Sequence, residues 1–173
     1  VWAWGYRGIN LCSENLAALS KAPESDFKTR TIAEVRTMRA LYYFIMMDLF
    51  GNVPLTPEYG STVLPEQTGQ ESVFAFIETE VTESIPALTR EVSANSYGRP
   101  TQWMAQALLA KLYINAEVYI GEAHYNEAIA ACNAIINADT NGDGTADNPY
   151  ALTSNFLSIF DVNNGPQIKE IIF

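Results

Sequence analysis

The segment from Asp139 to Asp147 has the residue types and the spacing of a calcium-binding loop. Its sequence is Asp-Thr-Asn-Gly-Asp-Gly-Thr-Ala-Asp, so Asp139, Asn141 and Asp143 take positions 1, 3 and 5. Calcium binds several hard oxygen ligands, a glycine at position 6 permits the sharp turn between them, and position 7 supplies a backbone oxygen. Thr145 takes position 7 and Asp147 takes position 9. We therefore expect these five residues to ligate Ca²⁺.

The end of this loop departs from an EF-hand. Position 12 is Tyr150 instead of the bidentate glutamate, so we expect no helix to leave the loop. A turn rich in Asn, Asp and Gly that holds no metal is the alternative interpretation. Three carboxylates in one loop repel each other, which favours a bound cation. Because no nucleophile or general base accompanies the loop, we expect the ion to be structural rather than catalytic.

Aromatic side chains near helix ends are the candidates for binding a ligand by stacking. Trp2 and Trp4 lie at the start of the chain, where side chains can be exposed, and we select these two as ligand-binding candidates. Trp103 lies on the apolar side of its expected helix and is assigned to the core. Core packing is the alternative for every one of these rings, because aromatic residues contribute strongly to protein cores.

The remaining inventory offers little for catalysis. The chain has one histidine, His124, which we place in a solvated turn, and two cysteines, Cys12 and Cys132, which we expect to pack as small apolar side chains. A formal charge of −10 argues against binding nucleic acid or an anionic membrane by charge alone. We therefore expect a protein that is not an enzyme, although a pair of carboxylates for glycoside hydrolysis is defined in space rather than in sequence.

Arg36 and Arg39 lie three residues apart, so they can share one face of a helix. They could bind an anionic ligand, but the acidic excess favours ion pairs with acids such as Glu34 or Asp48. We expect these pairs to have a structural role.

The segment from Thr31 to Phe50 predicts a buried central helix. Thr31 and Glu34 form a capping box at its start, and Gly51 followed by Pro54 marks its end. Between these signals, residues 40–47 are apolar or aromatic on every face, so other helices should surround this one.

Four further segments have helical periodicity or helix-end signals. Residues 53–69 have no periodicity and are predicted to be a connecting loop. The coarse prediction is an all-α fold of antiparallel helical pairs with long connecting loops. The further helical segments are 4–19, 71–88 with a capping box at Thr68 and Glu71, 103–119 with Thr101 as its N-cap, and 125–137.

The last two helical segments are similar to a tetratricopeptide unit. Leu109, Ala110 and Leu112 lie in the first helix, Gly121 lies in the turn, and Tyr125-Asn-Glu-Ala-Ile begins the second. In such a unit, a tyrosine and an alanine seat the second helix in the groove of the first. The match needs one extra residue in the turn and lacks the closing proline, so a generic helical hairpin is the alternative.

Several stretches together resemble the SusD/RagB family of outer-membrane nutrient-binding lipoproteins. The stretch most similar to the family is Ala33-Glu-Val-Arg, Arg39-Ala-Leu-Tyr-Tyr-Phe and Leu49-Phe-Gly-Asn-Val-Pro-Leu. The other matching stretches, in chain order, are Tyr6 to Leu16, Phe76 to Leu88, Gly98-Arg-Pro-Thr leading into Ala105 to Tyr113, Asn155-Phe with Phe160, and Glu170-Ile-Ile-Phe.

The resemblance implies non-catalytic capture of a glycan, or in some relatives a peptide, at the cell surface. It implies a lipid anchor in the outer membrane and delivery of the oligosaccharide to a TonB-dependent transporter of the SusC type. The helical repeats would form the scaffold and the surface that contacts the transporter, and aromatic loops would hold the ligand. A lipidated cysteine would precede Val1, so neither Cys12 nor Cys132 takes that role.

The chain begins without a signal peptide and ends on an apolar run, Glu170 to Phe173, that favours a strand. We therefore expect residues 1–173 to form one SusD-like helical domain within a longer protein, with residues 139–147 as an inserted acidic loop. The alternative function is a tetratricopeptide-type scaffold that binds a protein or a peptide.

Overall fold

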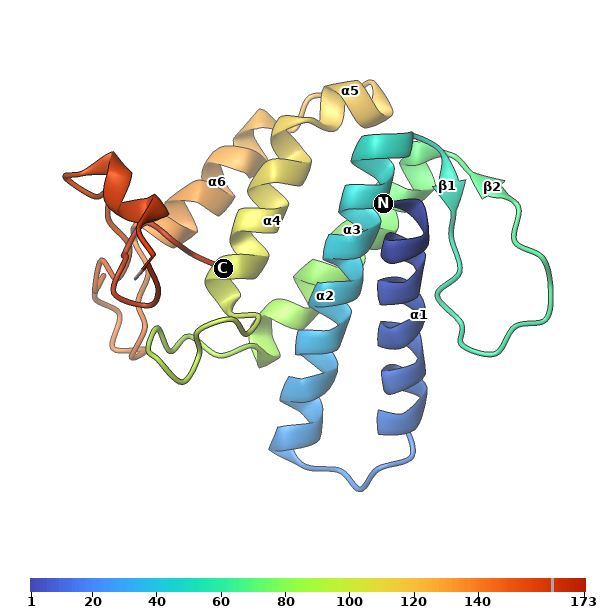
Figure 1. Cartoon of the computed structure of the whole chain (residues 1–173), viewed down its shortest axis with the longest axis horizontal. Coiled ribbons are helices and arrows are strands. Elements are labelled where there is room, and N and C mark those ends of the chain that lie inside the picture. The colour runs from blue at the N-terminus through green and yellow to red at the C-terminus, as the bar shows by residue number, and fades with distance from the viewer. Residues whose placement is uncertain (163) are drawn as a thin grey trace.

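The computed structural model describes residues 1–162 and 164–173, and its regular structure is almost entirely helical (Figure 1). The all-α prediction is therefore confirmed. The two short strands form one antiparallel pair, in which Val53 lies opposite Thr68. The elements are α1 (Trp2–Leu19), α2 (Asp26–Phe50), β1 (Val53–Pro54), β2 (Gln67–Thr68), α3 (Gln70–Ser84), α4 (Gln102–Ile114), α5 (Ala116–Ile120), α6 (Tyr125–Ile136), and the 3₁₀ helices η1 (Ile85–Ala87) and η2 (Phe156–Phe160).

Helices α1 and α2 form an antiparallel hairpin, and α3 packs on α2 (Figure 1). Two glycines of α1 make the close approach to α2 feasible. A Cβ atom at Gly5 would collide with Met46, and one at Gly8 would collide with the ring of Tyr42. Small residues at these two positions therefore decide how near the two helices lie.

Helix α2 begins at Asp26, five residues before the predicted start at Thr31. The prediction that Thr31 opens the helix with a capping box is therefore wrong. Ser25 is the N-cap, and its Oγ accepts a hydrogen bond of 3.1 Å from the amide of Lys28. The Lys28 side chain is buried, and its Nζ donates to the Ala22 carbonyl oxygen at 2.8 Å. This bond stabilises a first turn that has no apolar periodicity. The predicted end is confirmed, because Gly51 has a φ of 72° and its amide donates to Met47.

Helix α3 also begins differently from the prediction. Thr68 belongs to β2 and pairs with Val53, so it cannot cap the helix, and Gly69 takes the N-cap position without a side-chain bond. At the other end, α3 stops at Ser84, and Pro86 lies in the 3₁₀ helix η1 that follows.

Helices α4 and α6 form the second packed pair, which lies beside α2 and α3 (Figure 1). Thr101 caps α4 as predicted, since its Oγ1 accepts from the amide of Met104 at 3.2 Å. Helix α4 ends at Ile114 instead of Tyr119, and α5 supplies the extra length of the connection. Ala128 is buried against α4, but Tyr125 is 50% exposed and does not seat α6. The tetratricopeptide expectation for Tyr125 is therefore wrong.

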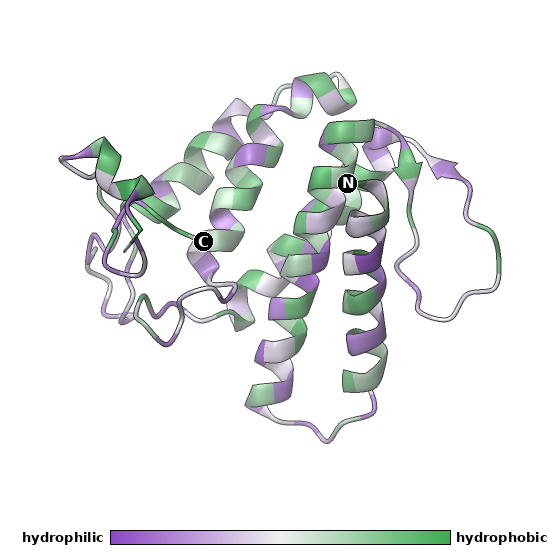
Figure 2. Cartoon of the chain, viewed as in Figure 1, coloured by the Kyte–Doolittle hydropathy of each residue, from purple (hydrophilic) through white to green (hydrophobic). Residues whose placement is uncertain are grey.

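The core is centred on the middle of α2, as the sequence predicts. Figure 2 shows that hydrophobic residues recur along α2 and α4, and both helices contribute buried residues to the core. None of the described helices combines the length and the apolar character that a membrane span requires. The predicted strand over Glu170–Phe173 is wrong, because residues 171–173 have no regular structure. The fully buried large apolar side chains are Ile9, Tyr43, Met46, Met47, Val53, Val73, Ile77, Val81 and Leu112.

Candidate functional site

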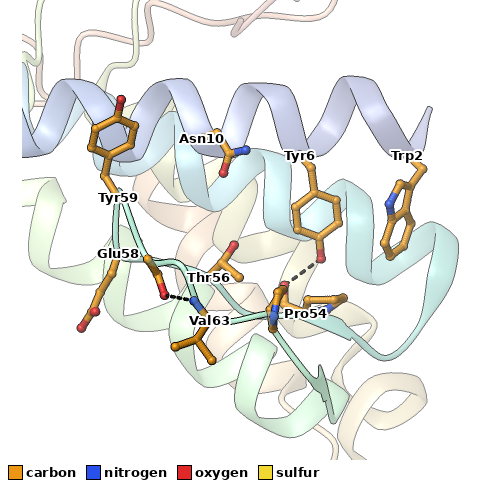
Figure 3. A pocket seen from close by; sticks show the side chains of 11 residues that line it. Trp2, Tyr6, Asn10, Pro54, Thr56, Glu58, Tyr59 and Val63 are labelled. Atoms are coloured by element: carbon orange, nitrogen blue, oxygen red, sulfur yellow. Dashed lines mark hydrogen bonds between the residues drawn. The ribbon is translucent and has the colours of Figure 1, made fainter.

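An open pocket of about 430 Å³ lies between α1 and the loop that joins β1 to β2 (Figure 3). Helix α1 forms one wall, and the loop forms the other. We call this cavity the α1 pocket. It is lined by Trp2, Tyr6, Asn10, Pro54, Thr56, Glu58, Tyr59, Gly60, Ser61, Val63 and Pro65.

Helix α1 presents Trp2, Tyr6 and Asn10 to the pocket at intervals of four residues, which is the spacing of one helix face. Trp2 is 45% exposed, and two other rings pack against its ring. Its centroid lies 4.9 Å from that of Tyr6 and 5.1 Å from that of Phe50, which it meets edge to face. Trp2 therefore offers a fixed aromatic surface that is open to a ligand.

Trp4 lies outside the residues that line the α1 pocket. Its ring packs edge to face on Tyr42, with centroids 5.0 Å apart, and it is 54% exposed. The structure thus brings Trp2 to the pocket and does not bring Trp4 there. Ligand binding by either residue stays a prediction.

Hydrogen bonds from helical side chains fix the first part of the loop. The hydroxyl of Tyr6 donates to the Pro54 carbonyl oxygen at 2.7 Å, and the hydroxyl of Tyr43 accepts from the amide of Thr56 at 2.8 Å. Burial raises the pKa of both tyrosines, so both hydroxyls stay protonated at physiological pH. Further along, the Tyr59 hydroxyl donates to Glu14 at 3.3 Å.

The pocket combines aromatic rings with mostly uncharged polar groups. Asn10, Thr56 and Ser61 supply amide and hydroxyl groups, and Glu58 is the one carboxylate among the described lining residues. None of those lining residues is Lys, Arg or His. This chemistry suits a hydroxyl-rich, uncharged ligand that stacks on rings and exchanges hydrogen bonds. A single lining carboxylate does not supply the pair that glycoside hydrolysis ordinarily uses.

The sequence identified Trp2 but missed the other rings and polar groups of the α1 pocket. Tyr6 and Asn10 could have been found by extending the four-residue spacing from Trp2 along α1. Thr56 and Tyr59 lie in a connection without periodicity, so no sequence signal indicated which of its residues face α1.

The expected ion pairs of Arg36 and Arg39 exist, but the predicted partners are wrong. Both guanidinium groups donate to the carboxylate of Glu80 in α3. Glu34 instead accepts from Arg99, and Asp48 accepts from the hydroxyl of Tyr119 at 2.6 Å. Sequence spacing identified neighbours on α2, whereas the arginines point across the helix interface.

The acidic loop is held by hydrogen bonds of its own. Asp139 accepts from the amides of Gly142 at 2.6 Å and Gly144 at 3.0 Å, and Asp147 accepts from the amide and the hydroxyl of Thr140 at 2.6 Å each. The Gly144 amide is the main cause of the lowered pKa of Asp139, and the Thr140 hydroxyl is the main cause of the lowered pKa of Asp147.

Asp143 takes part in three further hydrogen bonds, one of which joins the Asn141 side-chain amide to its carboxylate at 3.1 Å. Its carboxylate accepts from the amide of Thr145 at 2.8 Å, and its amide donates to the side-chain oxygen of Asn141 at 2.9 Å. In the part of the chain that the structure describes, no group of three His, Cys, Asp or Glu side chains is placed to hold a metal ion. Calcium binding by Asp139, Asn141, Asp143, Thr145 and Asp147 therefore stays a prediction.

His124 and Cys132 are placed differently from the expectation. The His124 ring stacks on Tyr113 with centroids 5.8 Å apart and an angle of 14°, so it packs on the helices rather than lying in a solvated turn. Cys12 is buried as expected, but Cys132 is exposed on α6. An exposed thiol does not pack as a core side chain.

Comparisons with known proteins find a family described as "Starch-binding associating with outer membrane", of the SusD-like type, over residues 1–114. A starch-binding protein SusD of Bacteroides thetaiotaomicron is 29% identical over 99% of this chain, and the chain spans 30% of the length of that relative. A SusD-like protein of Bacteroides ovatus is 28% identical over 65% of this chain, which spans 21% of its length.

The fold is shared with solved structures. A laminarin-binding SusD-like protein matches 94% of this chain at 28% identity, with a TM-score of 0.78, and the match covers 34% of that protein. A SusD-like protein of Bacteroides fragilis matches 99% of this chain at 21% identity, with a TM-score of 0.81, and the match covers 32% of that protein. At that identity, the second match supports the arrangement of the helices alone.

Proposed function

This chain belongs to the SusD-like family described as starch-binding and associating with the outer membrane, and on that premise we propose that it takes part in non-catalytic capture of a glycan at the surface of that membrane. The α1 pocket is the site in this proposal. The observation that carries it is the exposed Trp2 ring, which is held by Tyr6 and Phe50 on one side of a cavity lined by hydroxyl and amide groups.

An uncharged oligosaccharide fits this pocket better than an anionic one. The described lining residues include one carboxylate and no cationic side chain, and the whole chain carries a formal charge of −10. An anionic sugar would meet Glu58 without a compensating base, which costs binding energy. Aromatic faces and neutral polar groups bind sugar rings without requiring charge.

The chain spans under a third of the starch-binding relative, so the role of the whole protein is part of the proposal. In this proposal, the whole protein is anchored by a lipid at the outer membrane and delivers the oligosaccharide to a TonB-dependent transporter of the SusC type. The names of the relatives support binding of starch and of laminarin by those proteins.

Isothermal titration calorimetry with maltoheptaose, laminarihexaose and an oligogalacturonate tests the proposal, together with an assay for newly released reducing ends. We expect saturable binding of at least one neutral oligosaccharide, weaker binding of the oligogalacturonate and no released reducing ends. Release of reducing sugar would indicate an enzyme. Binding to an extended peptide without a response to any oligosaccharide would favour the tetratricopeptide-type scaffold and contradict glycan capture.

A further inference from the structure

Arg39 lies where α1, α2, α3 and the loop that joins β1 to β2 meet, and it is 7% exposed. Its Nε and Nη2 atoms donate to Oε2 of Glu80 in α3 at 2.8 and 2.6 Å. Its Nη1 atom donates to the hydroxyl of Ser13 in α1 at 3.2 Å and to the carbonyl oxygen of Pro57 at 3.0 Å. One guanidinium group thus connects α1, α2, α3 and the loop.

The position of this guanidinium group is fixed from several directions. Glu80 is 4% exposed and also accepts from Nε of Arg36 at 2.7 Å, and the Phe76 ring lies 5.4 Å from Cζ of Arg39. A buried ion pair adds little net stability, because desolvation offsets much of the attraction between the charges. The rigid fork of an arginine instead holds its donors at defined points, here opposite the carbonyl oxygen of Pro57.

The bond to Pro57 adds a third anchor to the bonds at Pro54 and Thr56 described above. Pro54 and Thr56 line the pocket before this anchor, and Glu58 and Tyr59 continue the lining directly after it. A loop that is ordered before the ligand arrives loses less conformational freedom on binding, which strengthens affinity. The hydrogen bond from Arg39 to Pro57 therefore fixes the backbone from which Glu58 and Tyr59 extend along the pocket.

We propose that Arg39 is a positioning residue for the α1 pocket, which orders the pocket-lining loop through the Pro57 carbonyl oxygen without touching the ligand. The effect on affinity rests on the proposed glycan binding. The effect on the loop does not, because it is a property of the free protein.

Arg36 provides a matched control. It shares the Glu80 carboxylate with Arg39, but its described hydrogen bonds go to Glu80 and Glu83 in α3 and not to the loop. Arg36→Lys and Arg39→Lys both keep a positive charge beside Glu80. Only the second replaces the fork that bonds Glu80, Ser13 and Pro57 together, since a lysine is a point charge on a flexible stem.

Hydrogen exchange by mass spectrometry on the free chain is the first readout. In Arg39→Lys, we expect the amides of residues 55, 56 and 58–61 to exchange about tenfold faster than in the parent, because the loop opens more often. In Arg36→Lys, exchange of these amides should stay within twofold of the parent. Parent-like loop exchange in Arg39→Lys, or equal loosening in both variants, would overturn the proposal.

Calorimetry with whichever of maltoheptaose and laminarihexaose the parent binds is the second readout. We expect a Kd about tenfold higher for Arg39→Lys and a nearly unchanged Kd for Arg36→Lys. If the parent binds neither probe, the proposed function fails, while the exchange rates still decide the role of Arg39. An unchanged Kd in Arg39→Lys would overturn the positioning role even if the loop were looser.

Arg39→Met covers the case in which the lysine variant does not fold. Methionine fills much of the same space without a charge, and Glu80 keeps its bond to Arg36. We expect this variant to fold by circular dichroism and to show the same faster exchange over residues 55–61. If both Arg39 variants unfold while Arg36→Lys stays folded, Arg39 is required for the fold itself and the positioning proposal is overturned.

Discussion

The hydroxyl of Tyr6 in α1 donates a 2.7 Å hydrogen bond to the carbonyl oxygen of Pro54 in β1. This bond joins the two walls of the α1 pocket, because Tyr6 lines it from the helix and Pro54 lines it from the end of β1, where the loop starts. The same residue supports the Trp2 ring from the side, so one tyrosine links the aromatic surface to the anchored end of the loop.

Tyr6→Phe removes this bond and leaves the ring in place. We expect the free energy of unfolding to fall by about 1 kcal/mol, the usual net worth of such a bond, and the loop amides to exchange faster. Urea denaturation and hydrogen exchange check this. The control is Tyr42→Phe. Tyr42 lies in α2 and packs on Trp4, away from the pocket, so this change should leave amide exchange in the loop unaltered. Equal loop exchange in the two variants would contradict the linking role of Tyr6.

The start of α2 gives a second prediction. Ser25→Ala removes the N-cap and should lower the free energy of unfolding by about 1 kcal/mol. Thr31→Ala should be neutral or slightly stabilising, because Thr31 lies inside the helix with its hydroxyl bonded to the Phe27 carbonyl oxygen. Chemical denaturation of the two variants distinguishes these outcomes. A larger loss in Thr31→Ala would place the helix start where the capping-box pattern predicts it.

The sequence predicted the helices far better than it predicted their ends. The buried run of α2, the cap at Thr101 and the stop at Gly51 depend on local chemistry, and they are confirmed. Thr68 failed as a cap because its backbone pairs with Val53, a contact between residues 15 positions apart that no local pattern encodes. Lys28 stabilises the first turn of α2 through a bond to the preceding loop, which periodicity cannot detect.

The acidic loop gives a third prediction. If Asp139 to Asp147 bind calcium, added Ca²⁺ should raise the melting temperature and a chelator should reverse the rise, because a ligand that binds only the folded state stabilises it. Asp143→Ala should lose this response. Glu122→Gln, an acidic position outside the loop, should keep it. A melting temperature that is unaffected by calcium and chelator would support the alternative, a turn held by its own hydrogen bonds.

The pH dependence of the same loop gives a fourth prediction. Hydrogen bonds lower the pKa of Asp139 and Asp147 below the ordinary value of about 3.9. A carboxyl whose pKa is lower in the folded state contributes stability above its unfolded pKa, and this contribution is lost as the pH falls through the folded pKa. The loop should therefore keep its bonds at pH 5 and lose them only as the pH falls through the lowered pKa values of these two carboxyls.

The amide chemical shifts of Gly142 and Gly144 report this change, because both amides donate to Asp139. In an NMR titration from pH 6 to pH 2, their shifts should move with a midpoint below the ordinary aspartate value. Asp139→Asn should remove this transition. A midpoint at or above the ordinary value would show that the bonds to Asp139 do not form in solution.

The residues of the candidate site could be predicted only in part. Trp2 was selected because it is aromatic and near a helix end, and Trp4 met the same two criteria. Residues two apart on a helix point in different directions, so both could not face one pocket. Deciding between them required knowing where the 55–66 loop lies, and that loop is placed by contacts of Tyr6, Tyr43 and Arg39 across long stretches of the chain.

The calorimetric comparison of Trp2→Ala with Trp4→Ala tests the central claim, that the α1 pocket binds a glycan, most directly. With maltoheptaose or laminarihexaose, we expect Trp2→Ala to bind at least about tenfold more weakly than the parent, because an aromatic residue that a ligand covers can carry much of the affinity. Trp4→Ala should bind within about twofold of the parent. Parent-like binding by Trp2→Ala, or an equal loss in Trp4→Ala, would contradict the claim.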